Sequence, residues 1–159
     1  MDSTLIYSNY DAEIGVSTVT IGTKYGVFTS SVKIHPQDKD VASELLGCEF
    51  AEMKCQIKAA QKRAEIFEAK ADGIRHALDV IWDSYYGPDK YNGHFNREAV
   101  TEFFDKLYNQ LFCAKKQAED ARETYILLRD GYRPYVENLL KIAHASQNRQ
   151  LQMKLNYDV

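Results

Sequence analysis

Basic and aromatic side chains cluster near the end of the second of two long apolar repeats. Guanidinium groups form bidentate hydrogen bonds with phosphates and stack on aromatic rings, so such a cluster could bind a nucleotide. The alternative is that these side chains form salt bridges, with Asp130 among them, and hold two parts of the chain together. We call this cluster the head junction, because it lies where the second long helix is expected to meet a small N-terminal head. Its candidate residues are Arg129, Tyr132, Arg133 and Tyr135.

A second cluster of the same residue types lies between the two repeats, at the expected tip of a helical hairpin. Tyrosine and arginine often dominate the binding energy of protein interfaces, which makes the tip a candidate binding surface. Its aromatic rings could equally seal the end of a coiled coil from water. The candidate tip residues are Tyr86, Lys90, Tyr91, Asn92, His94 and Arg97.

The other reactive side chains indicate neither a metal site nor catalysis. Cys48 and Cys55 share a helix face with Leu45, so we interpret them as core thiols rather than nucleophiles. The sequence contains no motif of a nucleotide-binding loop or a hydrolase. We therefore expect no metal, no cofactor and no enzymatic activity. The histidines lack the paired spacing of a zinc site and are His35, His76, His94 and His144.

Two long helices must position these clusters. From Leu46 to Tyr85 and from Val100 to Tyr132, apolar residues recur at alternating steps of four and three, the heptad pattern of a coiled coil. Pro88 ends the first helix, and the short connection makes the two helices antiparallel neighbours. Small residues then face small residues, with Ala60, Ala64 and Ala71 opposite the region of Ala114, Ala118 and Ala121.

Two glycines interrupt the first helix without breaking its heptad pattern. Gly47 and Gly73 each cost about 1 kcal/mol relative to alanine in a helix interior. Close packing at both positions would explain them.

A small β-structure precedes the first helix. Residues rich in Val, Thr, Ile and Ser predict a hairpin of Ile14–Thr23 and Val27–His35, and Thr4–Ser8 predicts a short edge strand. Asp40 can accept a hydrogen bond as the N-cap of a helix that begins near Val41.

The C-terminal part of the chain predicts one more helix and one more strand. Gly131 can close the second long helix, and Pro134 suits the first turn of a third, shorter helix. From Leu151 to Val159 apolar and polar residues alternate, which indicates a half-buried strand that joins the hairpin.

Together these elements predict a mostly helical α+β fold. Residues 1–52 form the head with the β-hairpin and the start of the first helix, 53–130 form an antiparallel coiled-coil stalk, and 131–159 return to the head with the third helix and the strand. We expect the sheet and the third helix to cover the apolar positions Leu45, Cys48 and Cys55.

Composition narrows the class of protein. The net charge is −3, and the sequence contains no long run of basic or of acidic residues. Both observations argue against a general nucleic-acid binder. No apolar run approaches the roughly 18 residues of a membrane span, and the polar start lacks the layout of a secretion signal. We expect a cytoplasmic protein with reduced thiols. The open edges of a short sheet need partners, so we also expect a homo-oligomer.

One segment carries a resemblance to known proteins. GVFTSSVKIHPQDKDVASELLGCEFAEMKCQIKAA covers about a fifth of the chain and combines a strand, a His-Pro turn and a helix with an early glycine. It resembles segments of small bacteriophage proteins. A β head followed by helices also distantly resembles the phage-encoded Thoeris anti-defence proteins, which sequester a cyclic nucleotide signal. The resemblance implies a protein of the infected bacterial cytoplasm, and no ligand-binding residue is carried over from it.

Three functions remain open from the sequence. The leading hypothesis is a non-catalytic, phage-type binding protein that occupies or sequesters a host protein and inhibits an anti-phage defence system. The second is an oligomeric sponge for a nucleotide immune signal, held by arginine and tyrosine side chains. The third is a structural or assembly coiled-coil protein.

Overall fold

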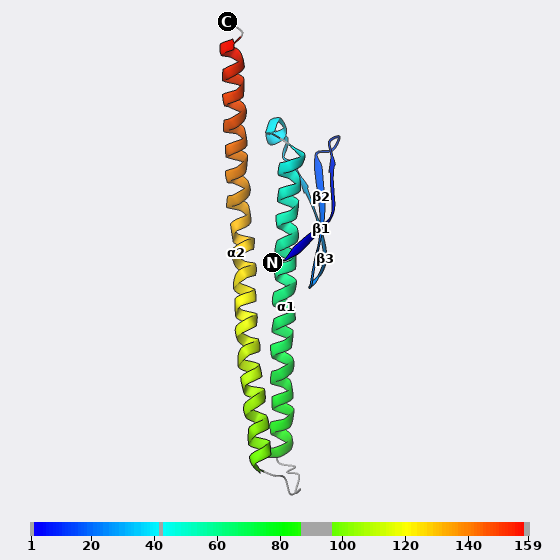
Figure 1. Ribbon diagram of the computed structural model, residues 1–159, viewed down its shortest axis with the longest axis vertical. Helices are drawn as coiled ribbons and strands as arrows, with labels where there is room; N and C mark the ends of the chain where they lie inside the picture. The colour runs from blue at the N-terminus through cyan, green and yellow to red at the C-terminus, as the bar shows by residue number, and fades with distance from the viewer. Residues whose placement is uncertain (1, 42, 87–96, 158–159) are drawn as a thin grey trace. The chain divides into compact units, whose positions relative to one another are not determined.

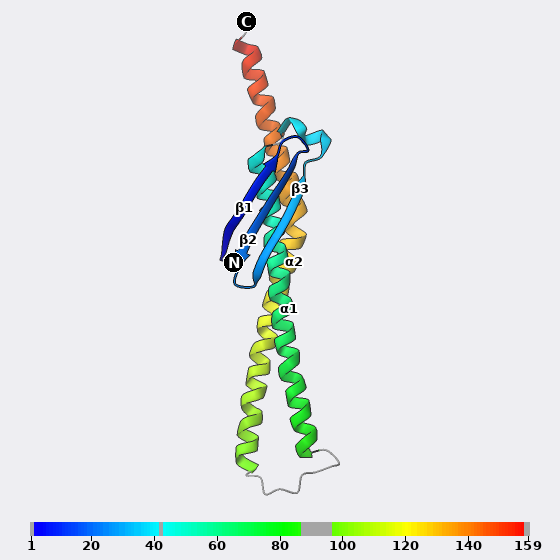
Figure 2. The ribbon, with the colours of Figure 1, turned by 90° about the vertical axis from the view of Figure 1, so that its right-hand side faces the viewer.

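The computed structural model describes residues 2–41, 43–86 and 97–157. The chain divides into two compact units, which are residues 1–59 with 125–159 (unit 1) and residues 60–124 (unit 2). Each long helix contributes to both units. The elements, shown in Figures 1 and 2, are β1 (Ser3–Asp11), β2 (Val16–Thr23), β3 (Gly26–Lys33), the 3-10 helix η1 (Pro36–Val41), α1 (Glu44–Tyr86) and α2 (Arg97–Tyr157).

Unit 1 contains an antiparallel sheet in the order β1-β2-β3. On the central strand, Val19 pairs with Ser8 of β1 and with Ser30 of β3. The turn into β3 places Gly26 at a φ of 138°, a conformation that favours glycine. The predicted hairpin is therefore confirmed, and the predicted edge strand exists but runs from Ser3 to Asp11.

The first part of α1 covers one face of this sheet, and α2 lies on the other side of α1 (Figure 1). Val19 and Ile21 of β2 pack against Ala51 and Cys55 of α1, and all four side chains are buried. The thiol of Cys55 donates a hydrogen bond to the Val19 carbonyl oxygen, with 3.2 Å between the heavy atoms. The expectation that the sheet covers Cys55 is confirmed.

The two helix glycines differ in their surroundings. A Cβ atom added to Gly47 would lie 2.0 Å from the Ser17 Oγ atom and 2.9 Å from the Ser17 Cβ atom. A Cβ added to Gly73 would meet nothing within 4 Å. The prediction of close packing is thus confirmed at Gly47 and wrong at Gly73.

The start of α1 differs from the prediction. Residues Pro36–Val41 form a 3-10 helix, and α1 begins at Glu44 rather than near Val41. The N-cap is Ser43, whose hydroxyl accepts a hydrogen bond from the Leu46 amide at 3.2 Å. The prediction of Asp40 as N-cap is wrong because the chain makes a separate tight turn before serine, an equally good cap, starts the helix.

In unit 2 the two helices pack antiparallel through their predicted heptad positions. Trp82 lies edge-on to Phe104, with 5.8 Å between ring centroids, and Glu68 forms an ion pair with Arg122 at 3.9 Å. The predicted alanines of this unit are buried. The helical hairpin is confirmed, and its supercoiling stays a prediction. The buried core contains Ala71, Leu78, Phe104, Leu111 and Ala114.

The predicted third helix is wrong as a separate element. α2 continues from Arg97 to Tyr157 through Gly131 and Pro134, and Gly131 does not adopt a positive φ. Because Gly131 keeps a helical backbone conformation, the helix does not end there. Proline removes one backbone hydrogen bond to Asp130 and crowds that carbonyl, a local cost that the rest of the long helix outweighs.

The predicted C-terminal strand is also wrong, because residues Leu151–Tyr157 are the end of α2. The alternation that suggested a strand also places Leu151 and Leu155 four residues apart, a spacing that fits a helix face equally well. Val159 lies outside the described residues.

Candidate functional site

A groove opens in unit 1 between β1 and α1. Its volume is about 520 Å³. The groove exists because α1 covers β2 but not β1, whose residues from Ser3 to Asn9 are all exposed. Ser8 and Leu5 pair with Val19 and Ile21 of β2, so they face the same side of the sheet as those buried residues. This β1 groove is lined by Leu5, Ser8, Val19, Leu45, Cys48, Glu49, Glu52, Met53, Gln56 and Tyr135.

Two carboxylates give the β1 groove its charge. Glu49 accepts a hydrogen bond from the Tyr135 hydroxyl of α2, and Glu52 accepts one from the Gln56 side-chain amide at 3.5 Å. The hydrogen bond to Glu49 raises the pKa of Tyr135, so the phenol stays neutral and remains a donor. Among the described residues, no lysine, arginine or histidine forms an ion pair with either glutamate.

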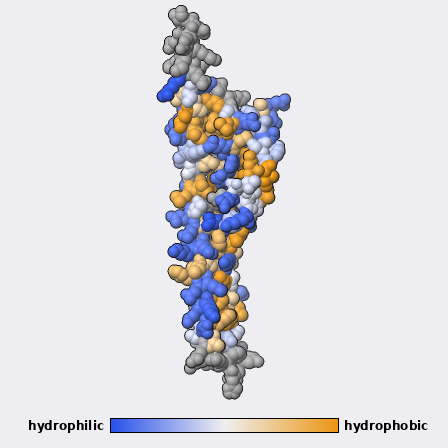
Figure 3. Space-filling view, viewed as in Figure 1, coloured by the Kyte–Doolittle hydropathy of each residue, from blue (hydrophilic) through white to orange (hydrophobic). Residues whose placement is uncertain are grey.

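Apolar side chains border these carboxylates. Leu45 is 77% exposed and Leu5 is 56% exposed. The prediction that the sheet covers Leu45 is wrong, because Leu45 stays largely exposed although β1 reaches α1 one turn further on, at Cys48. Cys48 is half-buried, and its sulfur accepts a hydrogen bond from the Ser8 hydroxyl at 3.1 Å. Figure 3 shows apolar surface distributed among polar surface on one side of unit 1.

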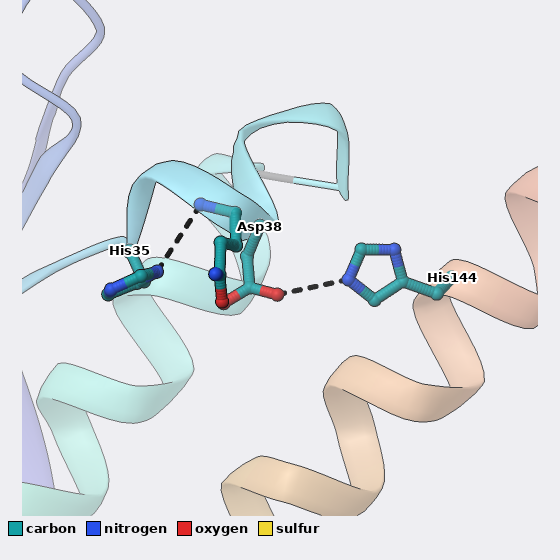
Figure 4. Close-up of polar contacts among 4 residues, drawn as sticks. His35, Asp38 and His144 are labelled. Carbon is teal, nitrogen blue, oxygen red and sulfur yellow. Dashed lines mark hydrogen bonds and ion pairs between the residues drawn. The ribbon is translucent and has the colours of Figure 1, made fainter.

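A second, smaller pocket of about 160 Å³ lies between β3, η1, α1 and α2 in unit 1. Most of its lining side chains are apolar, and two polar lining residues, His35 and Asp38, make the contacts drawn in Figure 4. A hydrogen bond of 3.0 Å joins His144 Nε2 to the Asp38 carboxylate, and the backbone N–H of Gln37 donates one to His35 Nδ1 at 3.3 Å. The Asp38–His144 hydrogen bond connects η1 with α2.

Neither place has the ligands of a metal centre. In the described parts of the chain, no group of three His, Cys, Asp or Glu side chains is arranged to hold a metal ion. The β1 groove presents apolar side chains and two carboxylates.

The structure separates the four head-junction residues. Tyr135 lines the β1 groove, whereas Tyr132 lines the second pocket, with the Lys54 ammonium 5.7 Å from its ring centroid. Burial raises the pKa of the Tyr132 hydroxyl. The two tyrosines thus contribute to different places.

The two arginines of the head junction form ion pairs within α2. Arg129 contacts Asp130 at 2.8 Å and lies 5.6 Å from the centroid of the Tyr125 ring, while Arg133 contacts Glu137 at 2.9 Å. The hydrogen bond from Arg129 lowers the pKa of Asp130. Neither arginine lines the β1 groove or the second pocket.

The predicted tip falls mostly beyond the described residues. Tyr86 ends α1 and Arg97 begins α2, and their side chains are not described. The other tip candidates, Lys90, Tyr91, Asn92 and His94, lie outside the described residues.

Sequence reasoning missed the acidic part of the β1 groove, although a signal was present. Leu45, Glu49, Glu52 and Gln56 recur at steps of four, three and four, so they form one stripe on α1 beside the apolar heptad positions. The spacing alone does not tell whether another element covers this stripe or leaves it exposed.

No helix in the described residues is long and apolar enough to span a membrane. Comparison of the chain with models of protein families, with curated proteins and with solved structures found no match.

Proposed function

We propose that this protein is a non-catalytic binding protein that occupies or sequesters a host protein through the β1 groove. The observation that carries the proposal is the open groove itself, in which Leu5 and Leu45 stay exposed beside an edge strand. Burying one leucine side chain fully contributes about 1.5–3 kcal/mol, so a partner that covers both gains a substantial part of its binding energy there.

The biological role that we propose is inhibition of a bacterial anti-phage defence system in the cytoplasm of the infected host. This part rests on the resemblance of residues 26–60 to small phage proteins. The α1 residues of the groove belong to that same segment, so the resemblance and the site concern one part of the chain.

Protein binding is favoured over a nucleotide sponge by the charges of unit 1. A nucleotide phosphate needs cationic donors. Arg129 and Arg133 each have a carboxylate partner in α2, and the β1 groove contributes Glu49 and Glu52, which repel phosphate.

The test is affinity capture from host lysate with the wild-type protein and two leucine variants. Leu45→Asp places a charge in the groove, and the matched control Leu127→Asp makes the same change at an exposed leucine of α2. We expect a specific host protein to be retained by the wild type and by the control, and lost with Leu45→Asp. Equal retention by all three proteins, or equal loss with both variants, would refute the groove as the binding site.

The tip hypothesis is tested in the same capture. Replacement of Tyr86 and Tyr91 by alanine should leave the host protein bound if the β1 groove is the site. Loss of the host protein with this variant alone would move the binding surface to the tip. Ultraviolet-absorbing material released from the purified wild type would instead favour the nucleotide sponge.

A further inference from the structure

We propose that the partner supplies a basic segment in extended conformation, which pairs with β1 as a fourth strand and places a lysine or arginine side chain at Glu49 and Glu52. This inference rests on the proposed function, because it names the kind of partner that the β1 groove accepts.

The outer edge of β1 is the first argument. β1 pairs with β2 along one edge, and no backbone hydrogen bond joins its other edge to a described element. Natural edge strands are usually protected by lysine, proline, a β-bulge or short length. β1 is nine residues long, STLIYSNYD, and Asp11 is its only charged residue. Its pairing with β2 shifts register between Leu5 and Tyr7 and is regular from Tyr7 to Asp11, so that regular part is the edge open to pairing. An extended segment can therefore bind to this edge by main-chain hydrogen bonds.

The position of the groove is the second argument. A strand added to β1 would lie about 4.8 Å beyond it. Leu5 and Ser8 both face the groove because the register of β1 shifts between Leu5 and Tyr7. Beside the regular pairs from Tyr7 onward, every second side chain of the added strand would face the same space. The fourth strand would thus extend the sheet over the part of α1 that β1 leaves open.

The charge of the groove decides which side chains fit. Glu49 and Glu52 are three residues apart on α1 and share a helix face, and no described cation is paired with either. A guanidinium or ammonium group satisfies both requirements of the site, charge and hydrogen-bond donors. Leu5, Leu45 and Met53 can contact the aliphatic part of that side chain and an apolar neighbour two residues away.

The same charges argue against a second copy of this chain as the occupant. The β1 sequence contains no lysine or arginine. Antiparallel pairing of two β1 strands would bring the Glu49 and Glu52 carboxylates of both copies to one interface without a cation to compensate them. Charge complementarity therefore selects a different, basic protein segment.

The test uses a fluorescein-labelled peptide of nine residues, the length of β1. Its sequence is Thr-Val-Thr-Leu-Thr-Arg-Thr-Val-Thr, which places apolar and basic side chains on one face of a strand. Binding to the full-length protein is measured by fluorescence anisotropy. A control peptide carries glutamine in place of arginine, and two others carry N-methyl groups on one or the other alternate set of amides.

Two protein variants separate the groove from general electrostatic attraction. Glu49→Gln with Glu52→Gln removes the charges of the groove. The matched control is Asp79→Asn with Asp83→Asn, which removes two exposed carboxylates from the same helix in unit 2, neither of them in an ion pair with a described cation. We expect the groove variant to weaken peptide binding by about tenfold or more, the scale of a charge-assisted hydrogen bond, and the control to change it little. The glutamine peptide should show a similar loss.

Several outcomes would overturn the inference. Equal weakening by both acid-pair variants would show attraction to overall charge, and equal binding of the two N-methylated peptides would exclude strand pairing. A wild-type dimer in sedimentation that binds no peptide, and that Leu45→Asp converts to monomers, would make a second copy the occupant. If Leu45→Asp releases the captured host protein while the groove acid-pair variant retains it, the basic segment is wrong and the proposed function stands. If Leu45→Asp has no effect on capture, the proposed function itself fails.

Discussion

Gly47→Ala tests how closely β2 approaches α1. The added Cβ atom would lie 2.0 Å from the Ser17 Oγ atom and 2.9 Å from its Cβ atom, whereas carbon atoms in contact are normally about 3.5–4.0 Å apart. Ser17 is fully buried, and its hydroxyl has no hydrogen-bond partner among the described residues. Rotation of the hydroxyl would relieve the first contact but not the second. The strand and the helix must therefore move apart.

Two opposing effects set the size of the change. Overpacking a core typically costs about 1–3 kcal/mol. Alanine recovers about 1 kcal/mol of helix propensity relative to glycine. We therefore expect Gly47→Ala to lower the free energy of unfolding by up to about 2 kcal/mol, because the new methyl group meets the buried Ser17 Cβ atom, which is held by the backbone of β2.

Gly73→Ala is the matched control, because it makes the same chemical change in the same helix where a Cβ meets nothing within 4 Å. We expect it to raise the free energy of unfolding by up to about 1 kcal/mol. Both variants are compared with the wild type by urea unfolding followed by circular dichroism. If Gly47→Ala is as stabilising as Gly73→Ala, the close approach of β2 to α1 is wrong.

Three other changes give further expected outcomes. Pro134→Ala should raise the free energy of unfolding by up to about 3 kcal/mol, seen as a higher melting temperature, because a helix interior regains a hydrogen bond. Ala64→Leu or Ala118→Leu should lower it by about 1–3 kcal/mol, since both sites are buried, and unchanged melting in both would contradict the packing. The hydrogen bond to Glu49 raises the pKa of Tyr135 in the folded state. The stabilisation that this bond gives the folded protein is therefore fully present below the ordinary tyrosine pKa of about 10, and it is lost as pH rises through the higher folded-state pKa. Tyr135→Phe should abolish that alkaline loss in denaturation curves measured at successive pH values.

The parts of the fold that were predictable have local causes. The hairpin of β2 and β3 follows from β-branched residues on both sides of a turn at Gly26, and the long helices follow from heptads. Burial of Ala64 and Ala118 also follows, because heptad positions of two neighbouring helices must face each other.

The incorrect parts depend on competition between local and more distant effects. Gly131 and Pro134 are local signals for a helix end, but the apolar stripe that continues at Val136 and Leu140 lines a pocket with β3 and α1. Those contacts favour a continuous helix over two shorter ones. From Leu151 onward the spacing of the apolar residues fits both a strand and a helix face, so periodicity alone could not choose between them.

The candidate site was only partly predictable for the same reason. Tyr135 was identified as an interaction residue from its type, but its partner Glu49 lies far away in sequence and could not be paired with it. The β1 groove depends on how far α1 extends beneath the sheet. The contact between Gly47 and Ser17, which brings α1 close to β2, joins residues far apart in the sequence and has no signal in its periodicity.

The division of the chain has a consequence for the order of events during synthesis on the ribosome. Unit 1 is built from two segments, residues 1–59 and 125–159, so its sheet and the first turns of α1 emerge long before the α2 segment that lines the second pocket. Until then Leu46 and Phe50 lack their α2 neighbours and are available to chaperones. Residues 60–124 form the loop that separates the two segments of unit 1. When the two helices of unit 2 pair, this loop becomes effectively shorter, which lowers the entropic cost of completing unit 1. Nascent chains stalled before residue 125 should therefore be more sensitive to protease near α1 than released protein.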